Sequence, residues 1–513
     1  MHNSTTNPQA LPIRIIGAGL AGPEAAWQCA RRGLAVTLYE MRPVRGTPAH
    51  QTDLFAELVC SNSLKSDSEN SAPWLLKQEM RHAGSLLMEL GRRAAVPAGH
   101  ALAVDRLEFS RLATETIAAE PLIRVVREEV TSLGFDDAGF DGVTIIATGP
   151  LTSEALAAEI QRLSGSDRLF FFDSISPIVE ADSIDQSKTY RAARYDKGTA
   201  DYINCPMMRE EYEAFIAALA EAERVAGHEW DKAQYFEGCL PIEEIARRGP
   251  DTLRFGPMKP VGLRNPRTGN IPYAVVQLRQ ENLRADSYNL VGFQNHLKFG
   301  EQARILRMIP GLENARFLRY GQIHRNTYIN APALLTPTLQ MKQHPRILFA
   351  GQLSGVEGYV ESIATGLLAG LTAASLATGL AGGPFKPSSG LSGAFDLAGD
   401  PHPPAVAECG SEPGAPFLAS SGRTGIGPEP ATNGVPLAAP RASAHGSLAH
   451  YICNAGPADF QPANITFDLL EQLDEPTKRR VRDKKLRHQL VCERALAAFD
   501  SWFQQLAERL PTR

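Results

Sequence analysis

Cysteine is scarce in this sequence, with seven residues among 513 and no CxxC pair. So few thiols exclude a disulfide scaffold, and the missing CxxC spacing removes the usual zinc site, so no metal is expected. Each cysteine is therefore a buried apolar side chain, an inert surface thiol or a nucleophile. The seven lie at positions 29, 60, 205, 239, 409, 453 and 492.

A strong net charge and a targeting segment are also missing. The formal charge is 52 − 57 = −5, which excludes a global cationic field for nucleic acid but leaves room for a local basic patch. Residues 1–12 are polar and lack the apolar core of a signal peptide, so we expect a cytoplasmic protein. The uncharged run 362–385 is rich in Gly, Ala, Ser and Thr, which favours a buried helix with a Gly-Gly stop over a membrane span.

The N-terminal region has the pattern of one βαβ unit. An apolar run at 13–16 precedes GAGLAG (17–22), a helical pattern follows through Ala30, and AVTLYE (35–40) reads as the next strand. GAGLAG matches G-x-G-x-x-G, in which the glycines allow a tight turn, a close approach of pyrophosphate and close helix packing. Glu40 closes the second strand, where a carboxylate would take ribose hydroxyls. The predicted dinucleotide contacts are Gly17, Ala18, Gly19, Leu20, Ala21, Gly22 and Glu40.

The identity of the dinucleotide depends on glycine turns far along the chain. ATGP (147–150) and the turn that begins at Ala350 and Gly351 each follow a predicted buried strand and would bring backbone close to an extended cofactor. These turns favour FAD, and NAD as the sole cofactor is the minor alternative. We therefore include Gly351 among the cofactor contacts.

The predicted fold class is α/β, with a Rossmann-type FAD-binding domain, an inserted α+β domain and a C-terminal helical segment. Residues 384–446 are rich in Pro and Gly and poor in large apolar side chains, so we expect a disordered insertion there. The predicted divisions are 10–180 and 326–383 for the two parts of the FAD-binding domain, 181–325 for the inserted substrate or tRNA domain, 384–446 for the insertion, and 447–513 for the basic helical segment.

Two cysteines are candidates for a reactive thiol. Cys60 lies in ELVCSNSLKS (57–66), among polar residues that suit a loop and near the cation Lys65, a setting that lowers a thiol pKa. Cys239 lies between Gly238 and Pro241, which suggests a fixed turn that presents the sulfur. For both, structural packing remains the alternative. Cys205 is a weaker candidate, and Cys29 falls on the first helix and is expected in the core.

Positive charge is concentrated near the C-terminus. Seven of the ten residues from 478 to 487 are Lys or Arg. This run is either a solvated helix face or a contact with nucleic-acid phosphates, in which each cation adds a salt-dependent contribution. The candidates for RNA contact are Lys484, Lys485 and Arg487.

Several separate blocks together resemble one family, the folate- and FAD-dependent tRNA (uracil-5-)-methyltransferases. The match covers about residues 13–380 and resumes at 450–465 and 482–496, while the insertion departs from it. The blocks include IIGAGLAGPEAA, YEMRP, ELVCSNSLKS, FFDSISPI, YINCPM, FEGCLPIE, GPMKPVGL, YAVVQLRQEN and GQLSGVEGYVESIATG.

This resemblance implies an enzyme that forms 5-methyluridine in the T loop of tRNA, at position 54. It implies 5,10-methylenetetrahydrofolate as carbon donor, FAD as cofactor and NADH or NADPH as reductant, with tRNA as partner and no membrane. The two important thiols of the family fall on Cys60 and Cys239. The chemistry is consistent, because a thiolate that adds to carbon 6 of uracil activates carbon 5, and a second group must remove the carbon 5 proton. Which thiol takes which role stays open.

Three alternatives compete with this prediction. One is a related FAD- and folate-dependent enzyme that modifies the wobble uridine of tRNA. Another is a flavin oxidoreductase acting on a small metabolite, which would need neither paired thiols nor a basic segment. The third is a flavoprotein kept as an RNA-binding module without turnover.

Overall fold

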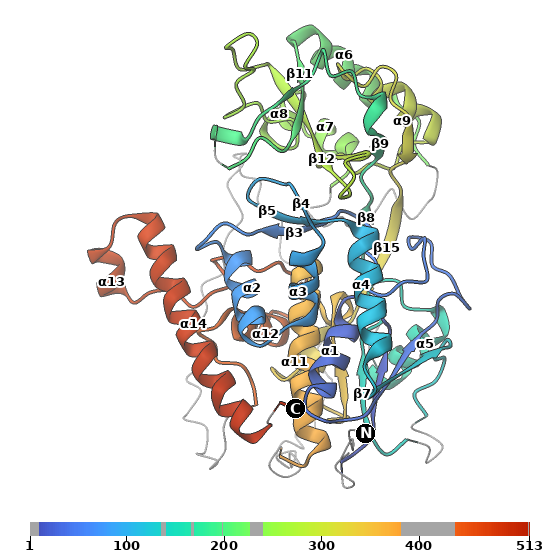
Figure 1. The fold of residues 1–513 in the computed structure, drawn as a ribbon, viewed down its shortest axis with the longest axis vertical. Helices are drawn as coiled ribbons and strands as arrows, with labels where there is room; N and C mark the ends of the chain where they lie inside the picture. The colour runs from blue at the N-terminus through green and yellow to red at the C-terminus, as the bar shows by residue number, and fades with distance from the viewer. Residues whose placement is uncertain are drawn as a thin grey trace, which may run out of the picture. The chain divides into compact units, whose positions relative to one another are not determined.

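The computed structural model describes residues 10–134, 140–165, 169–196, 198–225, 240–380, 437–510 and 512–513, with the backbone alone for 169–174 and 323–325. Its first sheet is parallel and five-stranded (Figure 1). The strands are short, largely apolar runs, which suits a sheet covered on both faces. Their order is β16 (Ile347–Phe349), β7 (Val143–Ile146), β1 (Ile13–Ile16), β2 (Val36–Glu40) and β6 (Ile123–Arg127).

Two helices pack on each other beside this sheet. The glycine turn after β1 leads into α1 (Ala21–Ala30), which lies along α11 (Tyr359–Ala377) in Figure 1. A Cβ on Gly366 or Gly370 would overlap the backbone of Ala21 or Ala25, so glycine is what permits this close contact. Among the described residues, α11 is the one helix long and apolar enough to cross a membrane, and it is buried in the protein. The buried helix predicted in 362–385 is therefore confirmed.

A second, antiparallel sheet of six strands is built from residues 178–319. The chain enters and leaves this region through a two-stranded ribbon of β8 (Leu169–Ser174) and β15 (Ile323–Tyr328). The strand order is β10 (Tyr190–Arg191), β11 (Ile203–Met207), β12 (Ala274–Gln280), β13 (Ser287–Leu290), β9 (Ile178–Glu180) and β14 (Phe317–Arg319). The helices of this region are α6 (Arg209–Glu221), α7 (Ile242–Arg247), α8 (Thr252–Phe255) and α9 (Phe299–Leu306).

A third sheet is small and carries the segment that follows Cys60. Its three strands are β3 (Ser63–Ser66), β5 (Ala101–Val104) and β4 (Ala95–Val96). The surrounding helices begin at side-chain caps: Ser71, Ser85 and Asp105 each accept a backbone N–H of the first turn. These helices are α2 (Ala72–His82), α3 (Leu86–Arg93) and α4 (Arg106–Ala119), and α5 (Glu154–Ser164) follows β7.

The C-terminal region is helical, as predicted. It contains α12 (Ala444–Asn454), α13 (Glu475–Arg480) and α14 (Lys484–Arg509), and α14 packs along α2 (Figure 1). The fully buried His445 donates to or accepts from Glu79 of α2 at 2.7 Å, which anchors α12. Most of the predicted insertion, residues 384–436, lies outside the described residues, and regular structure resumes at Ser443, the N-cap of α12.

Candidate active site

The glycine fingerprint forms a turn between β1 and α1. Gly17 has φ +99°, and a Cβ there would lie 2.6 Å from the carbonyl oxygen of Ala147. A Cβ on Gly22 would overlap the carbonyl oxygen of Gly17, whereas one on Gly19 would meet nothing within 4 Å. The first and third glycines are therefore required by the protein itself. The second leaves open space, as the approach of a ligand requires.

A cleft that is open to solvent lies over this turn at the carboxyl ends of the parallel strands. No side chain caps the N-terminus of α1, so its first N–H groups remain for an anion. A dinucleotide fits this arrangement, since the pyrophosphate can approach at Gly19. The cleft is lined by Gly17, Gly19, Leu20, Ala21, Glu40 and Gly351 of the predicted set, and by Tyr39, Arg42, Val59, Thr148, Leu151 and Tyr359.

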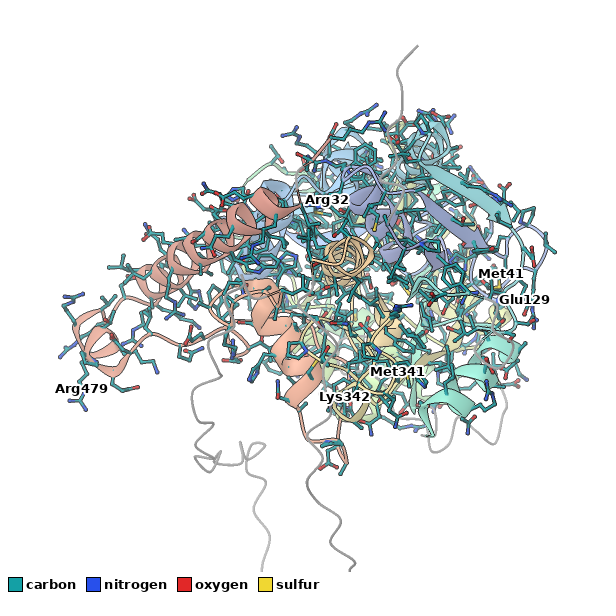
Figure 2. All side chains as sticks on the ribbon, turned by 90° about the horizontal axis from the view of Figure 1, so that it is seen from below. Arg32, Met41, Glu129, Met341, Lys342 and Arg479 are labelled. Atoms are coloured by element: carbon teal, nitrogen blue, oxygen red, sulfur yellow. The ribbon has the colours of Figure 1, made fainter. Side chains whose placement is uncertain are left out.

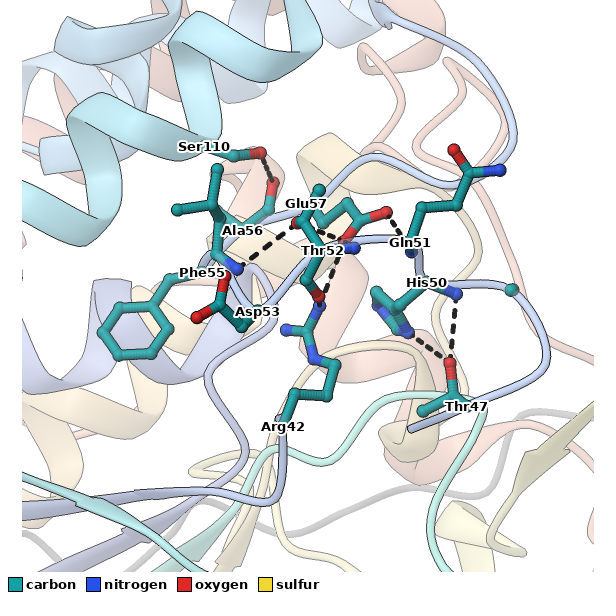
Figure 3. A network of polar contacts seen from close by, with 12 residues as sticks. Arg42, Thr47, His50, Gln51, Thr52, Asp53, Phe55, Ala56, Glu57 and Ser110 are labelled. Atoms are coloured by element: carbon teal, nitrogen blue, oxygen red, sulfur yellow. Dashed lines mark hydrogen bonds and ion pairs between the residues drawn. The ribbon is translucent and has the colours of Figure 1, made fainter. Parts of the chain in front are cut away.

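Buried ion pairs hold Glu40 at the end of β2. One carboxylate oxygen accepts the N–H of Ala18 at 2.8 Å, and the other accepts Nε of Arg42 at 2.9 Å. Burial alone would raise the pKa of Glu40, but the bonds from Arg42 outweigh it, so the pKa lies below its ordinary value. Arg42 also contacts Glu57 at 3.2 Å, and Figure 3 shows Glu57 tied in turn to Thr52 and Gln51. Glu40 is therefore a fixed anion on the cleft wall.

Cys60 lies beside this cleft. Its N–H donates to the phenol oxygen of Tyr359 at 2.7 Å, and Tyr359 lines the cleft at the start of α11. The thiol is half-buried and packs against the cluster of Ala49, Val59 and Ile175, of which Val59 also lines the cleft. The structure thus brings Cys60 to the edge of the space that the fingerprint opens.

Two arginines and a tyrosine near Cys60 were not found by sequence reasoning. Arg106, at the start of α4, donates to the carbonyl of Leu58 at 2.9 Å and pairs with Glu281 at 2.6 Å. Arg319, at the end of β14, donates to the carbonyl of Ala49 at 3.2 Å. Arg106 and Arg319 lie far from Cys60 in the sequence and stand in no motif, and Tyr359 lies in a family block whose pattern does not reveal its contact with Cys60.

Cys60 lies in an irregular segment, as predicted, but residues 63–66 form β3, and the nearby cation Lys65 is engaged elsewhere. Asn62 is fully buried and links the small sheet to the six-stranded one: its amide donates to Gln280 O at 2.8 Å, and its oxygen accepts Nε of Arg279 at 2.8 Å. Lys65, in β3, pairs with the buried Glu361 at 2.6 Å. A polar residue is buried at low cost when its hydrogen bonds are met, which composition alone does not reveal.

Two of the other cysteines, Cys29 and Cys205, lie among the described residues and can be compared with the predictions. Cys29 donates to the carbonyl of Gly370 at 3.3 Å, and burial raises its pKa to about 12. Burial likewise raises the pKa of Cys205 in β11 well above that of a free thiol. Both are core residues. Cys239 lies outside the described residues, so its placement stays a prediction.

The basic run forms the turn between α13 and α14. Lys484 and Lys485 are exposed, and Figure 2 shows Arg479 at the far end of this hairpin, pointing away from the ribbon. Arg487 differs, because its guanidinium donates to the carbonyls of Val481 and Lys478 at 2.5 and 2.8 Å. Arg487 therefore holds the turn closed, while the two lysines face solvent.

Comparison with known proteins identifies the family. The sequence pattern described as glucose inhibited division protein A matches residues 12–381. The methylenetetrahydrofolate--tRNA-(uracil-5-)-methyltransferase TrmFO of Koribacter versatilis is 64% identical over 492 residues, which cover 96% of this chain and 98% of that one. The protein of the same name from Solibacter usitatus is 58% identical over 496 residues, 96% of this chain and 98% of that one. The chain belongs to the TrmFO family.

The fold comparison agrees with this assignment. A crystal structure of Aquifex aeolicus GidA matches with a TM-score of 0.55 at 16% identity, over 72% of this chain and 64% of that one. At such low identity the likeness shows a shared fold alone. The predicted Rossmann-type α/β architecture is confirmed, and the resemblance to the TrmFO family is confirmed over nearly the whole chain.

Proposed function

We propose that this protein transfers the one-carbon unit of 5,10-methylenetetrahydrofolate to carbon 5 of the T-loop uridine of tRNA, with bound FAD and with NADH or NADPH as reductant. The observation that carries the proposal is Cys60, held by Tyr359 at the edge of a cleft built on a dinucleotide fingerprint. The full-length similarity to TrmFO proteins supports it. A cytoplasmic location is part of the proposal.

Each part of the cleft has a proposed role in cofactor binding. Gly19 gives the pyrophosphate access to the N-terminus of α1, and Glu40 presents a fixed carboxylate to ribose hydroxyls. Gly351 has φ +75°, so its backbone turns at the cleft where a side chain would be strained. When bound and reduced by NADH or NADPH, the flavin would supply the two electrons that complete the methyl group. Residues 10–180 and 326–383 would provide this site, and residues 181–325 the substrate contacts.

The thiol chemistry requires two groups. A thiolate adds to carbon 6 of the uracil, and the displaced π electrons form an enolate. Carbon 5 then bonds to the methylene carbon, whose two bonds to folate nitrogens break and leave their electron pairs on nitrogen, while a second group removes the proton from carbon 5. Two electrons from the reduced cofactor would complete the methyl group as the thiolate leaves carbon 6. Cys60 and Cys239 are proposed to share these roles. The target base lies within folded tRNA, so it must be extruded to reach them.

The decisive experiment measures transfer of label from 5,10-methylenetetrahydrofolate to undermodified tRNA in the presence of FAD and NADPH or NADH. We expect incorporation by the wild type and loss of incorporation in Cys60→Ala. Trapping with tRNA that carries 5-fluorouridine then assigns the nucleophile. If Cys60→Ala and Cys239→Ala both trap RNA as well as the wild type, neither thiol is the nucleophile. A protein that incorporates no label while reducing FAD would instead support a flavin oxidoreductase.

A further inference from the structure

The side chain of Arg319 reaches the environment of Cys60 from a different sheet. Its Nη2 donates to the carbonyl of Ala49 at 3.2 Å. Ala49 belongs to a small apolar cluster with Val59 and Ile175, and Cys60 packs against this same cluster. The guanidinium on β14 therefore contacts the wall of the Cys60 site, although the two residues are far apart in sequence.

Among the described residues, no carboxylate forms an ion pair with Arg319, and its buried Nε has no hydrogen-bond partner. The other cation at this site differs, because Arg106 is neutralised by Glu281 through bonds of 2.6 and 3.1 Å. The nearby Glu57 accepts bonds from Arg42, Thr52 and Gln51. Arg319 is therefore a partly buried positive charge that has no direct ion pair among the described residues, and an adjacent anion would stabilise it.

We propose that Arg319 is a positioning residue for Cys60, and that its guanidinium provides the counter-charge that holds the Cys60 sulfur as a thiolate. The step is a simple ionisation: the S–H bond breaks, its electron pair stays on sulfur, and the proton passes to water. No oxidant or reductant takes part. The inference deepens the proposed function and rests on it only in taking Cys60 to be a reacting thiol.

The other groups that face Cys60 agree with this assignment. Burial, followed by the like charge of Arg106, lowers the pKa of Arg319, and Cys60, then Tyr359 and Glu57, act in the opposite direction. Burial, followed by Cys60, raises the pKa of Tyr359 well above its ordinary value, so its phenol stays neutral. Tyr359 therefore adds no competing negative charge. Among the described residues, Glu281 and Glu57 are carboxylates of this region, and each forms an ion pair with another arginine.

The test is the pH dependence of Cys60 alkylation in the flavin-loaded, full-length protein. Iodoacetamide modification of Cys60 is followed by peptide mass spectrometry in the wild type, Arg319→Met and Arg319→Lys. Arg316→Met is the matched control, because Arg316 is exposed near the same strand and pairs with Glu180 and Asp182. The midpoint of the pH profile measures the pKa of the Cys60 thiol, whereas the plateau also depends on how easily iodoacetamide reaches the sulfur.

We expect Arg319→Met to raise the midpoint by about one pH unit, which slows alkylation about tenfold at pH values below both midpoints. Arg319→Lys should restore most of the rate, and Arg316→Met should match the wild type. An unchanged midpoint in Arg319→Met would overturn the proposal. Should that variant fail to fold, the wild type still decides, since a Cys60 midpoint at or above about 8.5, that of a free cysteine, would also overturn it.

This assay uses neither tRNA nor folate, so its outcome is separate from that of the proposed function. Loss of methylation in Cys60→Ala tests the function. The alkylation midpoint tests Arg319 alone, and either result can fail while the other stands.

Discussion

The glycines at 19 and 22 provide a matched pair that separates cofactor binding from folding. A methyl group on Gly19 meets no protein atom within 4 Å, whereas one on Gly22 overlaps the carbonyl oxygen of Gly17. Gly19→Ala should therefore leave the unfolding free energy of the flavin-free protein within about 0.5 kcal/mol of the wild type. Gly22→Ala forces α1 away from β1 and should lower it by about 3 kcal/mol.

Gly19→Ala should weaken FAD binding even though it leaves the stability of the protein unchanged. The new methyl of Gly19→Ala projects into the cleft where the pyrophosphate is proposed to approach, and we expect at least about a tenfold rise in Kd, or about 1.4 kcal/mol. Urea denaturation of the flavin-free protein measures stability, and quenching of flavin fluorescence measures Kd. A Gly19→Ala variant that binds FAD as tightly as the wild type would refute the reasoning.

Three further predictions concern charge. Lys65→Met removes the counter-ion of the buried Glu361 and should lower the free energy of unfolding in urea by about 3 kcal/mol. The double variant Lys65→Met/Glu361→Gln should recover part of this loss. A loss below about 1 kcal/mol in Lys65→Met would contradict the prediction. Burial lowers the pKa of Lys77 to about 8 from 10.5, so between these values the unfolded chain binds more protons and Lys77 adds stability as the pH rises. Lys77→Met should lack this rise in unfolding scans, and parallel pH profiles would disprove it. Replacing Lys484 and Lys485 by Ala should reduce the magnitude of the salt slope of tRNA binding by about 2 without loss of stability. Arg487→Ala should instead cost about 1 kcal/mol of stability, because it opens the α13–α14 turn. An unchanged salt slope would show that this run is a solvated helix face.

Local sequence predicted the parts of the fold that depend on local pattern. The strand, glycine turn and helix from Ile13 to Ala30 were found because each position has a short-range signal, and the apolar run in α11 was found because its composition suits close helix contact. The order of the six-stranded sheet was not predicted, since β9 pairs with β13 and β14, which lie far along the chain.

The candidate site was predicted in part for the same reason. The fingerprint and Cys60 stand in recognisable motifs, but no motif indicates which distant groups come to surround Cys60. Tyr359 and Arg319 reach it from α11 and β14, and Asn62 is buried because partners on β12 complete its hydrogen bonds. Pairings of this kind exist only after folding, and composition near Cys60 pointed to Lys65 instead.

Mass spectrometry of the tRNA product tests the central claim most directly. After incubation with 5,10-methylenetetrahydrofolate, FAD and a nicotinamide reductant, digestion of undermodified tRNA should yield one T-loop fragment heavier by a single methyl group, with the label on carbon 5 of its uridine. Methylation at the wobble position, or tRNA of unchanged mass beside a flavin that turns over, would contradict the account.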